Sequence, residues 1–325
     1  MKKTVAICLG ITLCFLFLTA CGIGKTDKEI SAVRVAGLKG PTSIGMVKMM
    51  EDASIGKSAL PYEFSIFGTA DEVTPKLLQG ELDIAAVPAN LASALYNNTD
   101  GAIQVIAINT LGVIYITEVG DSVHSLNDLR GKTIYATGKG TTPEFGLRYL
   151  LAENGIDPDK DITIEWKSEA TEIVALLKEN ESGIALLPQP YVFAAKAALP
   201  ELRVAVDLDE EWTRLENGSR MVTGVAIARK DFIEKNPDLI RDFLAEYKAS
   251  TEYVNANISE SASWVEKFGI FQAEVAEKAI PYCNITYIDG SEMRTAMEGY
   301  LNVLFEQNPK SIGGKIPDDG FYRAG

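Results

Sequence analysis

The amino-acid sequence predicts an α/β fold built from doubly wound sheets, and three observations lead to this prediction. Short apolar strands alternate along most of the chain with helices of about 10–15 residues. Helix-start signals follow directly after several of the strands. The chain has 325 residues, 46% hydrophobic and 23% charged, which is an ordinary globular balance with room for two domains.

The first strand–helix unit has the clearest signals for a binding loop. A β-branched strand from Val33 breaks at Gly37, and Gly40-Pro41 turns the chain. Thr42 or Ser43 is then expected to cap a helix that runs to Met50. Such a helix start leaves unpaired backbone N–H groups, which can hold an anion or another hydrogen-bond acceptor. An ordinary βα connection is the alternative, because many α/β loops have this composition.

The same alternation continues in two further series. Thr69-Ala-Asp-Glu72 is a capping box, Pro88-Ala-Asn90 opens a helix, and Thr141-Thr-Pro-Glu144 is predicted to be a second capping box with Pro143 in the first turn. The expected strands are 33–35, 62–67, 82–87, 103–108, 132–136, 162–166, 183–187, 202–206 and 221–228. A chain of this kind forms parallel sheets with right-handed crossovers.

The final third of the sequence is predicted to be almost entirely helical. After the strand at 221–228, helices are expected at 236–257, 259–268, 272–279 and 291–307. The tail from Pro309 is rich in Gly, Pro and Asp, so we expect it to wrap the surface.

Charge and side-chain chemistry exclude several classes of function. The net charge of -14 argues against a nucleic-acid partner, which needs clustered Lys and Arg. The chain has one histidine, His124, which removes His-based triads and clustered-His metal sites. We therefore predict no cofactor, no metal and no catalytic residue. Outside the first 21 residues Cys283 is alone, so no intrachain disulfide is expected.

The N-terminus resembles a lipoprotein signal peptide. Lys2 and Lys3 precede an apolar run at 4–20, and Leu18-Thr-Ala-Cys21 is similar to a lipobox. The resemblance implies that 1–20 is removed, that Cys21 carries lipid such as palmitate, and that 21–31 is a tether. A transmembrane anchor is the alternative, but the run is at the short limit of about 17–25 residues.

Three further segments resemble the periplasmic-type solute-binding proteins of ABC importers. They are Lys76-Leu-Leu-Gln-Gly-Glu-Leu-Asp-Ile84, Ser125-Leu-Asn-Asp-Leu-Arg-Gly-Lys-Thr-Ile134 and Phe232-Ile-Glu-Lys-Asn-Pro-Asp-Leu-Ile240. Together with the lipobox they extend over nearly the whole chain that follows the signal peptide. The nitrate/sulfonate/taurine-type binding proteins, which include binders of the thiamine pyrimidine precursor, are the most similar group.

This resemblance implies a type II periplasmic-binding-protein-like fold, in which two α/β lobes are joined by two crossing segments with a ligand cleft between them. Lobe one would be 32–113 plus 224–325 and lobe two 114–223, with crossings near 111–117 and 221–226. The lobes would open and close about the crossings.

The implied function is capture of a small polar molecule and delivery to the permease and ATPase of an ABC importer. The protein would be a monomer, lipid-anchored on the extracytoplasmic face of the cell membrane, in a periplasm or on a cell surface. A ligand-sensing lipoprotein for a membrane receptor is one alternative. An enzyme on the same fold, such as a dehydratase or a pyrimidine synthase without a catalytic histidine, is the other.

Ligands of doubly wound sheets bind beyond the carboxyl ends of the strands. Applied to the expected strands, that rule predicts these ligand-binding residues: Lys39, Gly40, Pro41, Thr42, Ser43, Pro88, Ala89, Asn90, Asn109, Thr110, Leu111, Lys139, Gly140, Thr141, Thr142, Pro143, Glu144, Gln189, Pro190, Tyr191 and Thr223.

The charge of the ligand stays open at this point. Lys39 and Lys139 would suit an anion, such as a nitrate- or sulfonate-like group, although exposed lysines are common. No candidate loop contains Arg, and Glu144 would repel an anion unless it only caps its helix. A neutral heterocycle held by Tyr191 and Asn90 fits nearly as well, and packing at the edge of its lobe is the equal alternative for Tyr191.

Overall fold

The computed structural model describes residues 32–323. The predicted signal peptide, the lipidated Cys21 and the tether lie outside these residues. Within 32–323, no helix combines the length and the apolar character needed to cross a membrane.

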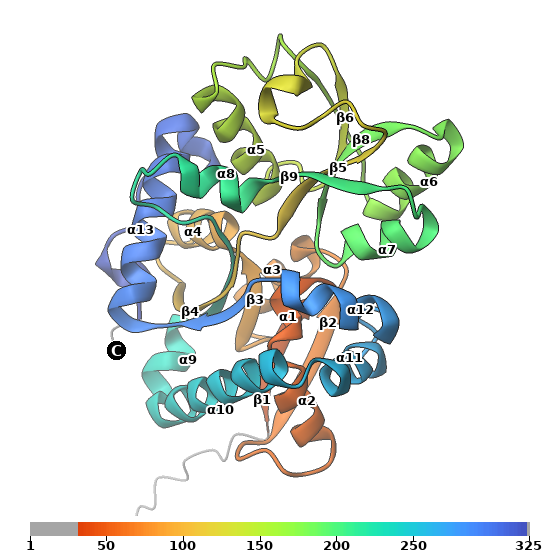
Figure 1. The fold of residues 1–325 in the computed structure, drawn as a ribbon. Coiled ribbons are helices and arrows are strands. Elements are labelled where there is room, and N and C mark those ends of the chain that lie inside the picture. Colours follow the sequence, from red (N-terminus) through yellow and green to blue (C-terminus); the bar gives the residue numbers. More distant parts are fainter. Residues whose placement is uncertain (1–31, 324–325) are drawn as a thin grey trace, which may run out of the picture. The chain divides into compact units, whose positions relative to one another are not determined.

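The strands form two separate sheets (Figure 1). The first sheet has the order β11-β4-β10-β3-β1-β2 and the second has the order β7-β6-β8-β5-β9. The strands are β1 Val33–Leu38, β2 Tyr62–Phe67, β3 Ile84–Pro88, β4 Ile103–Leu111, β5 Ile114–Val119, β6 Thr133–Ala136, β7 Thr163–Trp166, β8 Gly183–Pro188, β9 Arg203–Asp207, β10 Val222–Arg229 and β11 Ile285–Ile288.

Both sheets are mixed, so the prediction of purely parallel sheets is wrong. Strand β10 lies antiparallel between β3 and β4, and β5 lies antiparallel between β8 and β9. The chain leaves the first sheet through β4, enters the second through β5 and returns through β10. A strand that follows such a crossing enters its sheet in the opposite direction, whereas strands joined by a crossover helix are parallel.

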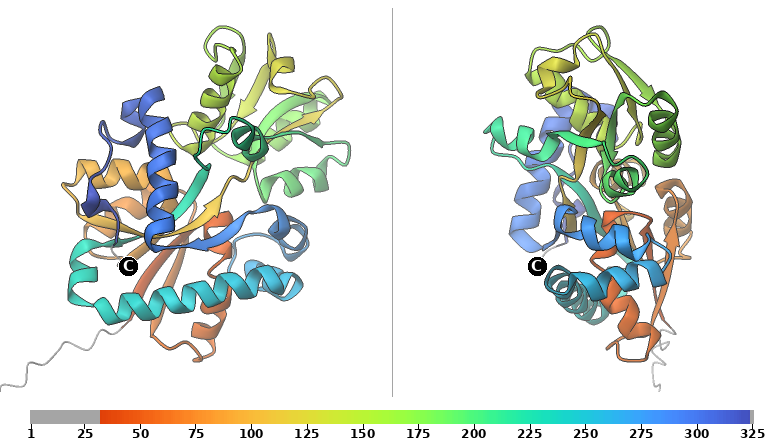
Figure 2. Two further views of the ribbon diagram at one scale, coloured as in Figure 1. Left: turned by 60° about the vertical axis from the view of Figure 1, so that its left-hand side comes forward. Right: turned by 45° about the vertical axis from the view of Figure 1, so that its right-hand side comes forward.

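Helices connect most of the strands, and they cover the sheets as Figures 1 and 2 show. They are α1 Pro41–Ile44, α2 Val47–Ser54, α3 Ala70–Leu78, α4 Ala89–Asn98, α5 Thr142–Glu153, α6 Ala170–Asn180, α7 Tyr191–Ala198, α8 Leu208–Arg214, α9 Lys230–Lys235, α10 Pro237–Ala256, α11 Ile258–Lys267, α12 Ala273–Ala279 and α13 Gly290–Gln307, with 3₁₀ turns η1 Leu126–Leu129, η2 Ile280–Tyr282, η3 Pro309–Ile312 and η4 Asp319–Phe321. Helices α8 and α9 and strand β11 are absent from the sequence prediction.

Two of the three predicted side-chain caps of helices differ from expectation. The capping box of Thr69 and Glu72 is present. Thr42 and Ser43 instead lie inside α1, because Gly40 is its N-cap and makes no side-chain cap. The predicted capping box at Thr141 is also wrong, since the backbone of the preceding turn takes the carboxylate that the box would use (see below).

One hydrophobic cluster draws residues from both sheets. It includes Val105 of β4 and Ile116 of β5, both fully buried, and Tyr300 of α13. Helix α13 contacts α4, β4 and β10 as well as α5 (Figure 2). It therefore packs on elements of both sheets beside the two crossings, and apolar burial holds them together there.

The tail after α13 does not simply wrap the surface. Ile312 and Phe321 are fully buried, and Tyr322 bridges to Val105. The backbone changes sheet between β4 and β5 and again before β10. The domain boundaries implied by the resemblance stay a prediction.

Candidate functional site

The candidate site is organised around one row of the first sheet, where Gly224 of β10 pairs with Pro88 of β3 and with Thr110 of β4. We call these three residues the Gly224 row. Pro88 ends its strand and Thr110 is one residue from the end of its own. The row thus lies at the carboxyl edge of β3 and β4, where ligands of doubly wound sheets bind.

The side chains of Thr42 and Asn109 press against Gly224. A Cβ atom at Gly224 would lie 2.5 Å from Thr42 Cγ2 and 2.5 Å from Asn109 Oδ1. Glycine at this position therefore lets a residue of α1 and a residue of β4 meet over β10. The hydroxyl of Thr110 donates to Asn109 Oδ1 at 2.9 Å, which turns the amide N–H groups of Asn109 away from Thr110.

Four buried polar atoms near the Gly224 row, and one just after strand β8 of the second sheet, have no hydrogen-bond partner within residues 32–323. They are Thr42 Oγ1, Asn90 Oδ1, Asn109 Nδ2, Gln189 Oε1 and Thr223 Oγ1. Asn90 lies two residues after Pro88, and Thr223 and Asn109 each adjoin a residue of the row. All five belong to the set predicted from the sequence.

The energetic weight of these atoms is large. A buried polar group without a partner costs about 1–3 kcal/mol, so five together would cost about 5–15 kcal/mol. That range equals the whole stability of a typical protein. Such a group of atoms is expected in a native protein only where water or a ligand meets them.

Asn90 connects the two sheets. Its Nδ2 group donates to Gly140 O at 3.3 Å, in the loop after β6, and to Ser311 O at 3.2 Å, in the tail. The residue is 2% exposed. The first turn of α4 thus contacts Gly140, a predicted site residue in the loop after β6 of the second sheet.

Gln189 lies on the second sheet beside the first crossing. Its backbone N–H donates to Val113 O at 3.0 Å, and its side chain is 2% exposed. The peptide bond between Gln189 and Pro190 is cis.

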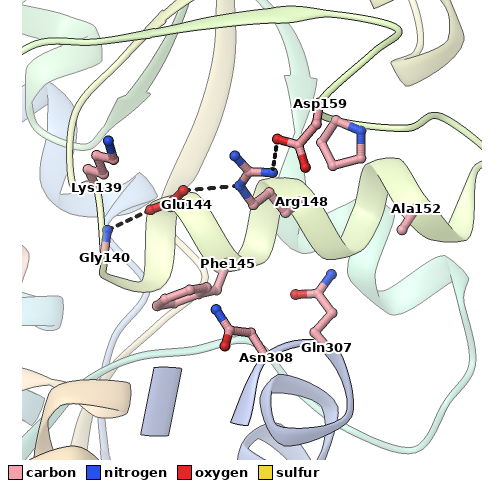
Figure 3. A pocket seen from close by; sticks show the side chains of 10 residues that line it. Lys139, Gly140, Glu144, Phe145, Arg148, Ala152, Asp159, Gln307 and Asn308 are labelled. Atoms are coloured by element: carbon pink, nitrogen blue, oxygen red, sulfur yellow. Dashed lines mark hydrogen bonds and ion pairs between the residues drawn. The ribbon is translucent and has the colours of Figure 1, made fainter. Parts of the chain in front are cut away.

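Glu144, predicted to touch ligand or to cap Thr141, has both oxygens engaged elsewhere (Figure 3). Oε2 accepts from the backbone N–H of Gly140 at 2.7 Å, and Oε1 accepts from Arg148 Nε at 3.0 Å. The hydroxyl of Thr141 donates to Gly138 O instead. Gly138 and Gly140 have φ of 80° and 77°, and this left-handed turn carries the Gly140 N–H over the start of α5. Glu144 therefore holds the loop.

A hollow of about 750 Å³ lies beside this carboxylate. Figure 3 shows Arg148 between Glu144 and Asp159, with Gln307 and Asn308 of the α13 end opposite Phe145. Because Arg148 is held by two carboxylates, at 3.0 and 2.9 Å, its charge is already balanced. Arg148 is therefore not a free cation for a ligand in this hollow.

A second hollow, of about 660 Å³, lies between loops of the two sheets. Lys39 and Pro88 line it from the first sheet, and Lys139, Gly140 and Thr141 line it from the second. Neither Lys39 nor Lys139 makes an ion pair within the described part of the chain. This hollow contains five predicted residues and opens next to Asn90, whose amide contacts Gly140.

Sequence reasoning missed several residues of this second hollow. Trp166 ends strand β7 and Lys167 follows it, and Ala70 and Asp71 begin helix α3. The signal was available, because β7 and α3 were both predicted and the same rule applies to the end of β7. Lys167 is paired with Glu165 at 3.2 Å and lies 5.5 Å from the Tyr135 ring centroid.

Other predicted residues have structural partners. Ser43 Oγ donates to Leu38 O at 2.6 Å, and Thr142 Oγ1 accepts from Tyr300 OH at 3.2 Å. Tyr191 packs edge-on against Phe271, with ring centroids 4.9 Å apart, and burial raises its pKa. Tyr191 therefore packs at the lobe edge, one of the two roles considered for it.

The first crossing has an unusual carboxylate beside it. A Cβ atom at Gly112 would lie 2.2 Å from Asp209 Oδ1, and Asn284 Nδ2 donates to Asp209 Oδ2 at 3.4 Å. Burial, together with the neighbouring Asp207, raises the pKa of Asp209 from 3.8 to about 6. The ionised form of Asp209 is thus disfavoured next to the crossing.

His124 and Cys283 are two further residues with catalytic potential. The side chain of His124 is 63% exposed, and its closest acidic partner is Asp121 at 3.7 Å. Cys283 is buried and free, and burial raises the pKa of its thiol. Among residues 32–323, no group of three or more His, Cys, Asp or Glu could hold a metal ion.

Several solved structures with a similar fold are described as ABC-transporter or periplasmic binding proteins. An ABC transporter protein from Parabacteroides distasonis has a TM-score of 0.75 and 24% identity, covering 90% of this chain and 99% of that one. The periplasmic aliphatic sulphonate binding protein of Escherichia coli has a TM-score of 0.69 and 18% identity, covering 87% and 96%. The predicted two-lobe α/β fold of periplasmic binding proteins is confirmed, and the nitrate/sulfonate/taurine-type subgroup stays a prediction.

Sequence relatives agree with a binding role. Proteins of Brucella abortus and Brucella suis, named provisionally as binding proteins, are 23% identical over 215 residues. The match covers 65% of this chain and 63% of each relative, so it spans less than two thirds of their length.

The match to a protein family is more extensive than the matches to single relatives. Residues 43–306 match the family described as menaquinone biosynthesis. This range begins at Ser43 in α1 and ends within α13, so it includes the Gly224 row and every strand of the two sheets except β1. Since it spans well over half of the sequence, the chain belongs to the menaquinone biosynthesis family.

Proposed function

We propose that this protein is an extracytoplasmic solute-binding protein that captures a small polar molecule between its two lobes and delivers it to an ABC-importer permease. The observation that carries the proposal is the group of buried polar atoms without partners around the Gly224 row and at Gln189. Their side chains come from segments far apart in the sequence, and three of them, Asn90, Asn109 and Gln189, are 2% exposed. Residues of this kind are suited to fixing the orientation of an enclosed ligand.

Contacts between the lobes give the proposal a mechanism. Asn90 bonds to Gly140, and Tyr191 packs on Phe271. A ligand that touches both sides stabilises the arrangement in which these contacts form, by its differential affinity for that state. Release to a permease then requires that the contacts break while the packing of α13 beside the crossings persists.

The anchor and the partners are part of the same proposal. Cys21 would carry lipid and hold the protein on the extracytoplasmic face of the membrane. Mass spectrometry of the mature protein tests this, with Cys21→Ala as the control variant. A mature protein that begins before residue 21 and carries no lipid contradicts the anchor. Genes for a permease and an ATPase beside this gene would support delivery over signalling to a receptor.

Binding itself is tested by thermal unfolding in the presence of nitrate, alkanesulfonates, pyrimidines and small carboxylates. A ligand at one hundred times its Kd stabilises the folded state by about 2.7 kcal/mol, which is readily measured. Thr42→Val removes a hydroxyl at the Gly224 row and should reduce the shift. Thr295→Val, on α13, removes a hydroxyl that bonds only to Ser291 O and serves as the matched control. Equal shifts in both variants would argue against the proposed site.

The family description favours one second candidate, a biosynthetic enzyme on the same fold. In this case a bound compound would be converted rather than released unchanged. Mass spectrometry of each stabilising compound after incubation with the protein separates the two functions. Unchanged compound supports binding and release, whereas a new product at turnover amounts supports the enzyme.

A further inference from the structure

The amide of Asn90 has an orientation that the surrounding backbone determines. Its Nδ2 group lies 3.3 Å from Gly140 O and 3.2 Å from Ser311 O, so both amide hydrogens have acceptors. Turning the amide over would place its oxygen against two carbonyl oxygens. The side chain must therefore present its oxygen, Oδ1, in the remaining direction.

That oxygen is buried and has no donor within residues 32–323. The amide oxygen accepts hydrogen bonds and cannot donate them. The neighbouring Thr42 and Thr223 offer hydroxyls, which can donate or accept and so do not discriminate between ligands. The Gln189 amide is not held by carbonyls in this way. Asn90 is thus the residue that requires a hydrogen-bond donor from the ligand.

We propose that Asn90 selects solutes that carry an N–H or O–H donor, and that it rejects bare acceptors such as nitrate and simple alkanesulfonates. The inference rests on the proposed function, because it concerns the ligand of the same site. It answers part of the question that the sequence left open, since a ligand that offers only acceptor atoms leaves Asn90 Oδ1 unpaired.

The chain contains a matched control for Asn90. Asn97 lies two turns later on α4, and its Nδ2 group also donates to two carbonyls, those of Ile312 and Lys315, at 2.8 and 2.7 Å. Its Oδ1 atom likewise has no partner in the described part of the chain. Asn97 contacts only the tail, however, and lies away from Gly140 and the Gly224 row.

The experiment compares paired probes that differ by one donor. Lactate and propionate form one pair, 4-aminopyrimidine and pyrimidine another, and nitrate and ethanesulfonate are added as acceptor-only anions. Native mass spectrometry with a small-molecule cell extract identifies further bound solutes. In the unmodified protein, donor-bearing solutes should bind at least about tenfold more tightly than their acceptor-only partners, because the latter leave a buried acceptor unpaired.

Asn90→Ala should reduce that ratio to about twofold or less, while Asn97→Ala should leave it unchanged. If Asn90 had only a structural role, Asn90→Ala would weaken the binding of both members of a pair equally. Tight binding of nitrate, ethanesulfonate or another solute without a donor would overturn the inference and leave the proposed function intact. If neither the probes nor any solute of the extract bind the unmodified protein, the proposed function fails and the inference fails with it.

Discussion

Substituting Gly224 by alanine tests the geometry on which the candidate site depends. The added Cβ would lie 2.5 Å from both Thr42 Cγ2 and Asn109 Oδ1, and 3.3 Å from Thr110 Cβ. Contacts between non-bonded heavy atoms are favourable only at about 3.5–4.0 Å. Strand β10 cannot move aside easily, because it is paired on both sides, with β3 and β4.

The expected cost follows from this crowding. Overpacking of a well-packed interior costs about 1–3 kcal/mol. For a protein of this size each kcal/mol lowers Tm by about 2–4 °C, so Gly224→Ala should lower Tm by about 2–12 °C. Thr42 and Asn109 can relieve the clash only by turning away from Gly224. Binding of any ligand found in the screen should therefore weaken as well.

The assay is thermal unfolding followed by circular dichroism, with and without ligand. Gly40→Ala is the control, because a Cβ atom at Gly40 meets no other atom within 4 Å. Thr42→Ser removes the crowded Cγ2 atom and should restore part of the stability of Gly224→Ala, as a double-mutant cycle would reveal. The refuting result is a Tm of Gly224→Ala within about 1 °C of the unmodified protein together with normal ligand binding. In that case the described contact of Thr42 and Asn109 over β10 is wrong.

Three further predictions concern single groups. Asp209 is protonated in the folded protein at pH values where the unfolded chain has lost the proton, so the free energy of unfolding should fall as pH rises from about 4 to about 6. Asp209→Asn should remove that fall in urea titrations. An unchanged pH profile in this variant would contradict the raised pKa. Glu144→Gln cannot accept from both Gly140 and Arg148, so the urea midpoint should drop by the equivalent of about 1–2 kcal/mol, and an unchanged midpoint would show that the loop is held otherwise. The buried Cys283 thiol should react with a thiol reagent only when urea unfolds the protein, and rapid labelling of folded protein would contradict its burial.

Much of the local structure was predictable because it depends on short stretches of sequence. Strand β2 has the predicted bounds of Tyr62–Phe67, and the capping box of Thr69 and Glu72 forms as expected. Helix α5 ends at Glu153, before the predicted Asn154-Gly155 stop. In each case hydrophobic periodicity and cap residues decide the conformation without distant contacts.

Errors occurred where a neighbouring turn competes for a side chain, and where a distant strand supplies the partner. Ser43 bonds to Leu38 O instead of capping α1, and Glu144 bonds to the N–H that the Gly138–Gly140 turn presents. Strand β11, Ile285–Ile288, was missed because the residues around it show no clear strand pattern. It is a short strand that pairs only with β4. Local pattern contains no information about such pairings.

The sequence by itself determined the α/β class, the alternation of strands and helices, and a set of loop residues that includes Thr42, Asn90, Asn109 and Thr223. The tertiary structure alone decided which of these residues meet. The antiparallel entry of β10 between β3 and β4 brings Asn109, Thr223 and Asn90 to one edge, and it leaves Glu144 committed to its own loop. Side-chain type follows from the gene, whereas the pairing of strands, and hence which polar atoms are buried without partners, depends on contacts between residues more than a hundred positions apart.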